Sequence, residues 1–485
     1  MINPIKNNNK NVLGQIIAIF FIEISSSTAF GIFYSGLSIF LTQQLQFTIH
    51  DATIITGIFL SIHYFLQLIG GMIANYLVSY KNLYFFGTLI SIWGCGLLAL
   101  HQDIYLGLSL FLMSSLVTNV CLRMFINNLF DSTDTKKRKV AFIWNFIGIN
   151  IGCLLGYFIS GYSTINENFN IAFLLIAGLL SLAVCLTLLL IVDKQNTYRK
   201  TRKASQILII ILILPIIILF LYNIFKFSPF FSKYFLYLAT ISVLTLILYS
   251  VFKIDVKERN NYLKFMGYSG LSILFWSLYM LTPLVFMQLI QSIVNRSIGG
   301  ITLAPQWFMY IDSIIILITG PILAFVINRN KKEMSSLNLY LYGLALCAFG
   351  LMILLYGLGS CNHFRILPWS ILSCMALFAV AETLISPLGN ALVGELIPPS
   401  IQPLMTGFWS MNIGIGILIA TFIANTVLLP YINNHSLLEN NFVTWENAFV
   451  IIIIMLFLLI LGIFTCTKLK NFIRVNKSRC QYGNS

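Results

Sequence analysis

Long runs of apolar residues, separated by short polar segments, dominate the chain. Most runs are about 20 to 30 residues long, which is enough for an α-helix to cross a bilayer. None of them alternates apolar and polar positions with the period of two that a strand of a membrane β-barrel needs. The pattern therefore predicts an all-α polytopic membrane protein with 14 spans, at about 12–42, 52–79, 83–101, 104–129, 140–164, 171–192, 206–224, 235–252, 263–294, 307–328, 337–359, 366–396, 401–430 and 446–467.

The composition supports this interpretation. Of the 485 residues, 58% are apolar and only 9% are charged, whereas a soluble protein carries about 25% charged residues. Too little polar surface remains for a soluble enzyme, a secreted disulfide scaffold or a disordered chain. The nine Cys are scattered, with neither a C-x-x-C motif nor a Cys/His cluster, so we expect no disulfide and no metal site. The sequence has no G-x-S-x-G, H-E-x-x-H or P-loop motif, and we expect no enzyme.

The net charge of +14 predicts orientation rather than binding to nucleic acid, because Lys and Arg gather in alternate short loops. If the N-terminus is cytoplasmic, most of these residues fall on the cytoplasmic side. The outside loops then hold only Lys226, Lys233, Arg296 and Arg365. By the positive-inside rule we expect both termini in the cytoplasm.

The spans fall into groups of six, two and six. A weak internal echo supports a repeat, because GGMIANYLVSYKN (from Gly70) and GPILAFVINRNKK (from Gly320) each end the second span of a group of six. Two six-helix bundles with a cargo site at the membrane midplane are the major facilitator architecture. We therefore predict an N-terminal bundle, two inserted helices, a C-terminal bundle and a cytoplasmic tail, at 1–200, 201–260, 261–470 and 471–485.

Charged residues inside a bilayer are costly and mark functional sites by default. Glu23, Arg123, Asp312 and Glu382 lie well inside predicted spans. A zwitterion held between two bundles needs opposite charges, and Arg123 can bind its carboxylate while Glu382 binds its ammonium group. The alternative is that Arg123 and Glu23 pair only to neutralise each other. His63, alone in its span, is more typical of a packed polar residue than of a catalyst.

Several segments resemble the bacterial branch of the proton-dependent oligopeptide transporter family. FFIEISSSTAFGIFYSGLSIFLTQQL (from Phe20) is similar to the first helix of that family, whose usual core is E-x-x-E-R-F followed by Y-Y-G. GINIG (from Gly148), AETLISPLGNALVGEL (from Ala381) and MTGFWSM (from Met405) resemble later helices. Bacterial members also insert two helices between the bundles. The resemblance implies a major facilitator fold and uptake of di- or tripeptides, with no cofactor and with the proton as coupling ion.

The resemblance also implies roles for single residues. Glu382 matches the glutamate that receives the peptide ammonium group, and Arg123 stands where the family has a lysine for the peptide carboxylate and the proton relay. The other implied pocket residues are Asn150 for the peptide backbone, Tyr64, and the aromatic walls Trp276 and Trp409. Packing is the alternative role for each tryptophan. The implied proton-coupling residues are Glu23, Arg123 and Glu382.

The chain departs from the family pattern where charges are expected. Ser26 and Ser27 replace the second Glu and the Arg of the first helix, Met280 and Leu281 replace Glu and Gln of the seventh core helix, and Asn75 replaces an Asp of the second. A guanidinium does not release its proton in proteins, so Glu23 is the better proton carrier. Two alternatives stay open: a transporter of another small polar solute, such as an amino acid or nucleoside, and a membrane sensor that binds peptide without moving it. We expect a monomer whose partners are a small peptide and lipid.

Overall fold

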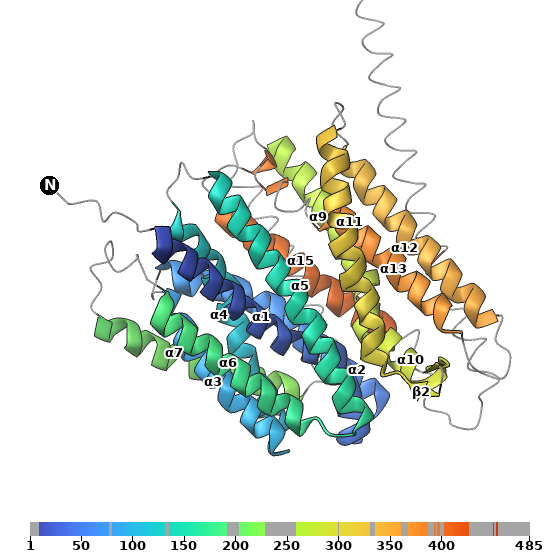
Figure 1. The fold of residues 1–485 in the computed structure, drawn as a ribbon, viewed down its shortest axis with the longest axis horizontal. Coiled ribbons are helices and arrows are strands. Elements are labelled where there is room, and N and C mark those ends of the chain that lie inside the picture. Colours follow the sequence, from blue (N-terminus) through green and yellow to red (C-terminus); the bar gives the residue numbers. More distant parts are fainter. Residues whose placement is uncertain are drawn as a thin grey trace, which may run out of the picture. The chain divides into compact units, whose positions relative to one another are not determined.

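The computed structural model of this chain is almost entirely helical (Figure 1). It describes the residues 9–76, 80–130, 135–191, 203–227, 259–298, 300–329, 335–359, 367–386, 392–393, 395–397, 402–425, 450 and 453.

The first six predicted spans are helices whose bounds lie within a few residues of the predicted ones. Apolar runs bounded by polar turns define these bounds well, because every backbone group inside a bilayer must be hydrogen-bonded within its own segment. The sixth helix is followed by the first of the two predicted inserted helices. The bounds are α1 Asn9–Ile39, continued by the π-helix η1 Phe40–Gln44, then α2 Ile49–Tyr76, α3 Tyr80–Ala99, α4 Ile104–Leu129, α5 Thr135–Ile165, α6 Asn170–Leu190 and α7 Lys203–Lys226.

The later part of the chain is more interrupted than its hydrophobic pattern predicts. The predicted span 263–294 is divided near Pro283 into a helix, a π-helical turn and a second helix, since proline removes a backbone donor. A short antiparallel strand pair follows, with Ile298 opposite Ile301 and Gly300 at a φ of 83°. The elements are α9 Arg259–Tyr279, η3 Thr282–Phe286, α10 Met287–Ile293, β1 Ser297–Ile298, β2 Ile301–Thr302, the 3-10 helix η4 Pro305–Met309, α11 Tyr310–Arg329, α12 Ser336–Gly359, α13 Pro368–Ile385 and α15 Gln402–Ile423.

In the described part of the chain, ten helices are long and apolar enough to cross a membrane, judged by length and composition. The predicted span 235–252 lies outside the described residues, and only residues 450 and 453 of the predicted span 446–467 are described. The protein is therefore a multi-pass α-helical membrane protein, as predicted, while the number of 14 spans stays a prediction.

Two compact units make up the chain. The first comprises Met1–Ser292, Arg296–Ser313 and Gly389–Pro430, and the second comprises Ile293–Asn295, Ile314–Leu388 and Tyr431–Ser485. The first unit contains α1 to α7, α9, η3, almost all of α10, η4 and α15. The second contains α12, α13 and most of α11.

Helices α1 and α5 pack closely along their length in the first unit (Figure 1). Glycines at every fourth position of α5 allow this approach. A methyl group added at Gly152 would lie 2.6 Å from the carbonyl oxygen of Ile24, and one at Gly156 would lie 2.7 Å from that of Thr28. Small residues at this spacing are typical of tightly packed membrane helices. The GINIG segment therefore brings the backbones of α1 and α5 together.

Hydrogen bonds also join the first six helices to α10, η4 and α15 within the first unit. The amide of Gln288 donates to the hydroxyl of Ser38 at 2.6 Å, and that of Gln306 donates to Thr164 at 2.6 Å. Ser61 donates to the backbone carbonyl of Gly414 at 2.8 Å. These contacts gather near the C-terminal ends of α1 and α5 and in the N-terminal half of α2, so they tie together one end of the unit.

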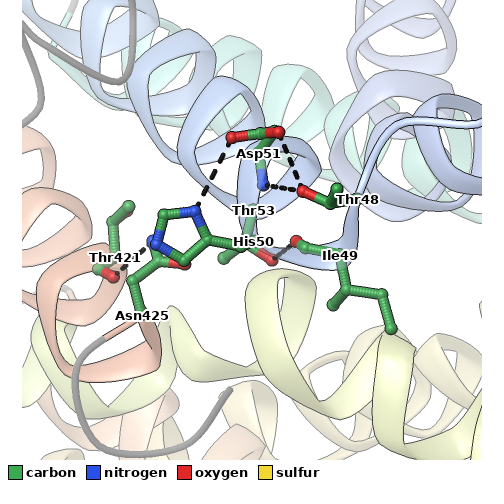
Figure 2. A network of polar contacts seen from close by, with 7 residues as sticks. All are labelled: Thr48, Ile49, His50, Asp51, Thr53, Thr421 and Asn425. Atoms are coloured by element: carbon green, nitrogen blue, oxygen red, sulfur yellow. Dashed lines mark hydrogen bonds and ion pairs between the residues drawn. The ribbon is translucent and has the colours of Figure 1, made fainter. Parts of the chain in front are cut away.

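The start of α2 shows why that helix begins at Ile49 (Figure 2). The hydroxyl of Thr48 accepts a hydrogen bond from the backbone N–H of Asp51 at 3.1 Å and donates to its carboxylate at 2.8 Å. This reciprocal arrangement is a variant of the capping box and satisfies one free donor of the first turn. His50 lies 3.6 Å from the same carboxylate, and Asn425 donates to the carbonyl of Thr421 on α15 in the same view.

Candidate substrate and proton site

Glu23 lies on α1 and is buried, with 3% of its surface exposed. The hydroxyl of Ser27, one helical turn later, donates to its carboxylate at 3.2 Å. The side chain of Asn145 on α5 also hydrogen-bonds to it, and Arg123 on α4 interacts with it electrostatically. Three helices therefore contribute to the surroundings of one carboxylate within the membrane.

Arg123 is exposed although it stands in the middle of an apolar helix. Its interaction with Glu23 places the guanidinium on the α1 side of α4. Among the described residues, His50 and Asp51 form the only ion pair closer than 4.0 Å, so Arg123 and Glu23 attract each other without direct contact. A guanidinium in this position is able to bind an anionic group of a cargo.

The serines that replace the charged residues of the family motif have defined roles here. Ser27 donates to Glu23, so a neutral donor takes the place of a charge. Ser26 lies 3.5 Å from the hydroxyl of Tyr84 on α3, which is fully buried. The departure from E-x-x-E-R-F therefore produces a polar cluster around Glu23 that has fewer charges than the family pattern predicts.

Two predicted pocket residues lie on α2 and α5 with local partners. Tyr64 is half-buried, and its ring centroid lies 5.1 Å from that of His63. His63 is buried; its Nδ1 lies 2.6 Å from the hydroxyl of Ser115 on α4, and its ring stacks on Phe30 at 4.1 Å. The amide of Asn150 donates to the carbonyl of Phe146 on its own helix at 2.9 Å.

The two predicted tryptophans are both largely buried, with 6% of Trp276 and 8% of Trp409 exposed. The ring of Trp276 meets that of Tyr279 edge to face at 5.4 Å, and its backbone side packs closely on Gly416 of α15. The ring of Trp409 lies 5.7 Å from that of Phe265. The ring of Trp409 therefore takes part in packing between α9 and α15, whereas the ring of Trp276 meets a neighbour on its own helix. The role of both rings as pocket walls stays a prediction.

The other two acidic residues inside predicted spans, Asp312 and Glu382, lie in different surroundings. Asp312 is 8% exposed and accepts a hydrogen bond from the hydroxyl of Tyr279 at 2.8 Å. Glu382 is half-buried on α13 and belongs to the second compact unit. Next to it, Thr383 lies 2.9 Å from the hydroxyl of Thr319 on α11. The bridging of Arg123 and Glu382 by one cargo remains a prediction.

Glu23 interacts electrostatically with Arg123 on α4 and Tyr84 on α3, and by a hydrogen bond with Asn145. Asn145 is a polar residue inside the predicted span 140–164, but nothing in the sequence identifies its partner. Tyr84 gave no signal at all, because a tyrosine near the start of a membrane helix is common.

Comparisons with known proteins agree with this architecture. The model of the POT family matches residues 75–438. Dipeptide and tripeptide permease A of Serratia proteamaculans is 21% identical over 81% of this chain and 79% of that relative, and permease B of Salmonella typhimurium is 22% identical over 85% and 86%. Other alignments are shorter: that with permease A of Pectobacterium carotovorum is 28% identical but spans 28% of this chain and 27% of the relative.

Solved structures have the same fold. Tetrameric PepTSo2 superimposes with a TM-score of 0.81 over 95% of this chain and 99% of its own, at 15% identity. A peptide transporter POT bound to alafosfalin gives a TM-score of 0.80 over 92% and 93%, at 17% identity. The fold is thus that of the major facilitator transporters, and the match over residues 75–438 shows that the chain belongs to the POT family.

Proposed function

We propose that this protein takes up di- and tripeptides together with protons across a bacterial inner membrane, by alternating access. The observation that carries the proposal is the exposed guanidinium of Arg123 beside the buried carboxylate of Glu23, within membrane helices of a POT fold. The names of the relatives, dipeptide and tripeptide permeases, support peptides as the cargo. The chemistry is binding and translocation, with no enzymatic step, no cofactor and no metal.

In this proposal Arg123 binds the peptide carboxylate and Glu382 binds its ammonium group. Tyr64, Asn150, Trp276 and Trp409 shape the space between. A site that holds both charged ends of a zwitterion discriminates strongly against solutes that lack one end, because the unmatched charge is left buried and unpaired. Peptide length and charge at the ends are therefore the main selected properties.

In this proposal Glu23 binds the proton, and the positive charge of Arg123 influences how readily Glu23 does so. Protonation removes a buried negative charge, which lowers the cost of closing the helices over the site. The membrane potential contributes about 2.3 kcal/mol per charge per 100 mV, so one proton per peptide supports a useful gradient. Glu382 is the further group able to exchange a proton with the cargo.

The contacts between early and late helices support one orientation of this cycle. With cytoplasmic termini, the hydrogen bonds of Ser38 with Gln288 and of Thr164 with Gln306 lie toward the outside, whereas Glu23 and Arg123 lie closer to the inside. Alternating access then requires these bonds to break when the outer entrance opens.

A second candidate function is transport of another small polar solute. Ser26, Ser27 and Met280 stand where the family resemblance implies charged residues, and Leu281 stands where it implies a glutamine. These replacements favour the second candidate, because they remove groups that the family pattern uses. A membrane peptide sensor that binds without transport is the third candidate. Both keep the binding residues and differ in cargo or in movement.

Uptake into proteoliposomes tests the proposal. Labelled dipeptides should accumulate when an inward proton gradient is imposed, and Glu382→Gln should weaken peptide affinity at least tenfold. Competition by amino acids or nucleosides, but not by dipeptides, would identify another solute. Peptide binding with no uptake across a broad dipeptide panel would identify a sensor.

A further inference from the structure

The side-chain amide of Asn145 is a feature of the Glu23 cluster that the proposed function does not use. Asn145 is buried, with 9% of its surface exposed, and hydrogen-bonds to the carboxylate of Glu23. Its carbonyl oxygen Oδ1 is buried and has no hydrogen-bond partner. Since a carboxylate only accepts hydrogen bonds, the donor to Glu23 is the Nδ2 group, and the Oδ1 acceptor is left over.

An unpaired buried acceptor costs free energy, so a state of the protein that supplies a donor to it is favoured by comparison. Within the described surroundings of Glu23, the hydroxyl of Ser27 is already engaged with the carboxylate. A protonated Glu23 carries one O–H donor that the ionised form lacks. Protonation of Glu23 therefore supplies a donor that Oδ1 of Asn145 can accept.

We propose that Asn145 is the positioning residue of the proton site, and that its amide serves Glu23 in both protonation states. Nδ2 donates to the ionised carboxylate. When a proton binds one carboxylate oxygen, the amide turns over and Oδ1 accepts the new O–H. The hydrogen bond from Nδ2 to the carboxylate breaks as the bond to Oδ1 forms, and when the proton leaves by the same oxygen the amide turns back. The inference rests on the proposed proton-coupled uptake.

The local packing permits this rotation while it holds the two residues together. Gly148 on α5 allows close approach, because an added methyl would lie 3.5 Å from Cβ of Glu23 and 3.3 Å from Phe20. Asn145 also lines a small cleft with Ile16, Phe20 and Trp144. The last torsion of an asparagine is broad and nearly two-fold, so exchange of its nitrogen and oxygen needs only this space.

The other titratable groups around Glu23 have different positions in the cluster. Arg123 on α4 acts on Glu23 through charge, and Tyr84 on α3 acts on it from the side of Ser26. His63 on α2 is engaged with Ser115. Within the described cluster, Asn145 donates to the carboxylate and also has a buried acceptor atom without a partner.

Two transport assays separate a positioning role from a structural one. Accumulation driven by a proton gradient needs proton binding and release, whereas equilibrium exchange of labelled for unlabelled dipeptide needs only binding and reorientation. Asn145→Leu, which keeps the shape and removes both hydrogen-bonding groups, should lose at least tenfold in accumulation and its dependence on external pH. It should keep peptide affinity and exchange within about twofold. Asn145→Gln should recover part of the accumulation.

Asn223→Leu is the matched control, because Asn223 is exposed on α7 and its amide donates to Leu219 of the same helix; it should behave as the wild type. Equal loss of accumulation and exchange in Asn145→Leu would overturn the inference, as would unchanged accumulation or an Asn145→Gln variant no better than Asn145→Leu. Absence of gradient-driven uptake in the wild type would overturn the proposed function itself, and this outcome is distinct from the others.

Discussion

Gln288 on α10 donates a 2.6 Å hydrogen bond to the hydroxyl of Ser38 on α1, and both side chains are at least 96% buried. Nearby along the same two segments, the hydroxyl of Tyr34 lies 3.8 Å from the sulfur of Met280. Neutral groups therefore hold these parts of the chain together. Bonds between neutral groups do not depend on ionic strength.

The hydrogen bond between Gln288 and Ser38 should be measurable by a double-mutant cycle. Gln288→Leu leaves the Ser38 hydroxyl buried without its donor, and Ser38→Ala leaves the Gln288 amide without its acceptor. Each should lower the free energy of unfolding by about 1–3 kcal/mol. The double variant should lose less than the sum, with a coupling of about 0.5–1.5 kcal/mol, measured by unfolding in detergent.

Ser181→Ala serves as the control for that cycle, because Ser181 is exposed and bonds to Ala177 of its own helix. It should change stability by less than about 0.5 kcal/mol. If the double variant loses as much stability as the two single variants together, the amide and the hydroxyl are not coupled in solution. Raising the salt concentration should leave the coupling unchanged.

Gly152→Ala tests the close packing of α1 on α5. The new methyl would lie 2.6 Å from the carbonyl oxygen of Ile24, so the helices must separate, at a cost of about 1–3 kcal/mol. Gly178→Ala on α6 is the matched control, because a methyl there meets nothing within 4 Å. It should be neutral or stabilise by about 0.5–1 kcal/mol, since alanine favours the helix. A thermal-shift assay compares the two, and equal effects would contradict the packing argument.

The helices could be predicted from the sequence because the bilayer imposes their length. The bounds of α4, predicted at 104–129, are those of the structure. The interruption between α9 and α10 was harder to predict, since Pro283 stands in an otherwise continuous apolar run. Whether a proline bends a helix, breaks it or leaves it straight depends on the helices packed around it.

The members of the candidate site could be predicted, but their partners could not. A charge in an apolar run identifies Glu23 and Arg123 without any structure. The interaction of Glu23 with Asn145 depends on how closely α5 approaches α1, which is a property of two segments more than 100 residues apart. The same holds for Asp312, whose partner Tyr279 lies 33 positions earlier in the chain. Polar residues that meet across helices have no local signature.

Glu23→Gln should separate proton coupling from peptide binding. Glutamine keeps the size and the acceptor oxygen of the side chain but cannot bind a transferable proton. Because the proton is a co-substrate in the proposed cycle, wild-type uptake should rise as the external pH falls, and the variant should lose this rise and at least 90% of its gradient-driven accumulation. Peptide affinity should change by less than about threefold. Glu167→Gln, at an exposed turn, is the control, and a Glu23→Gln variant that still accumulates peptide would remove Glu23 from the coupling mechanism.

His63 offers the opposite expectation. Its ring stacks on Phe30 at 4.1 Å, and its Nδ1 lies 2.6 Å from Ser115, so it joins α1, α2 and α4 as a packed polar residue. His63→Leu should therefore lower the free energy of unfolding by about 1–3 kcal/mol, because it leaves the Ser115 hydroxyl without this partner and loses the aromatic stack. The shape of uptake against external pH should stay that of the wild type. A flattened pH profile, like that expected for Glu23→Gln, would instead show that the imidazole takes part in proton transfer, and a double variant with Ser115→Ala would then tell whether the hydroxyl belongs to the same path.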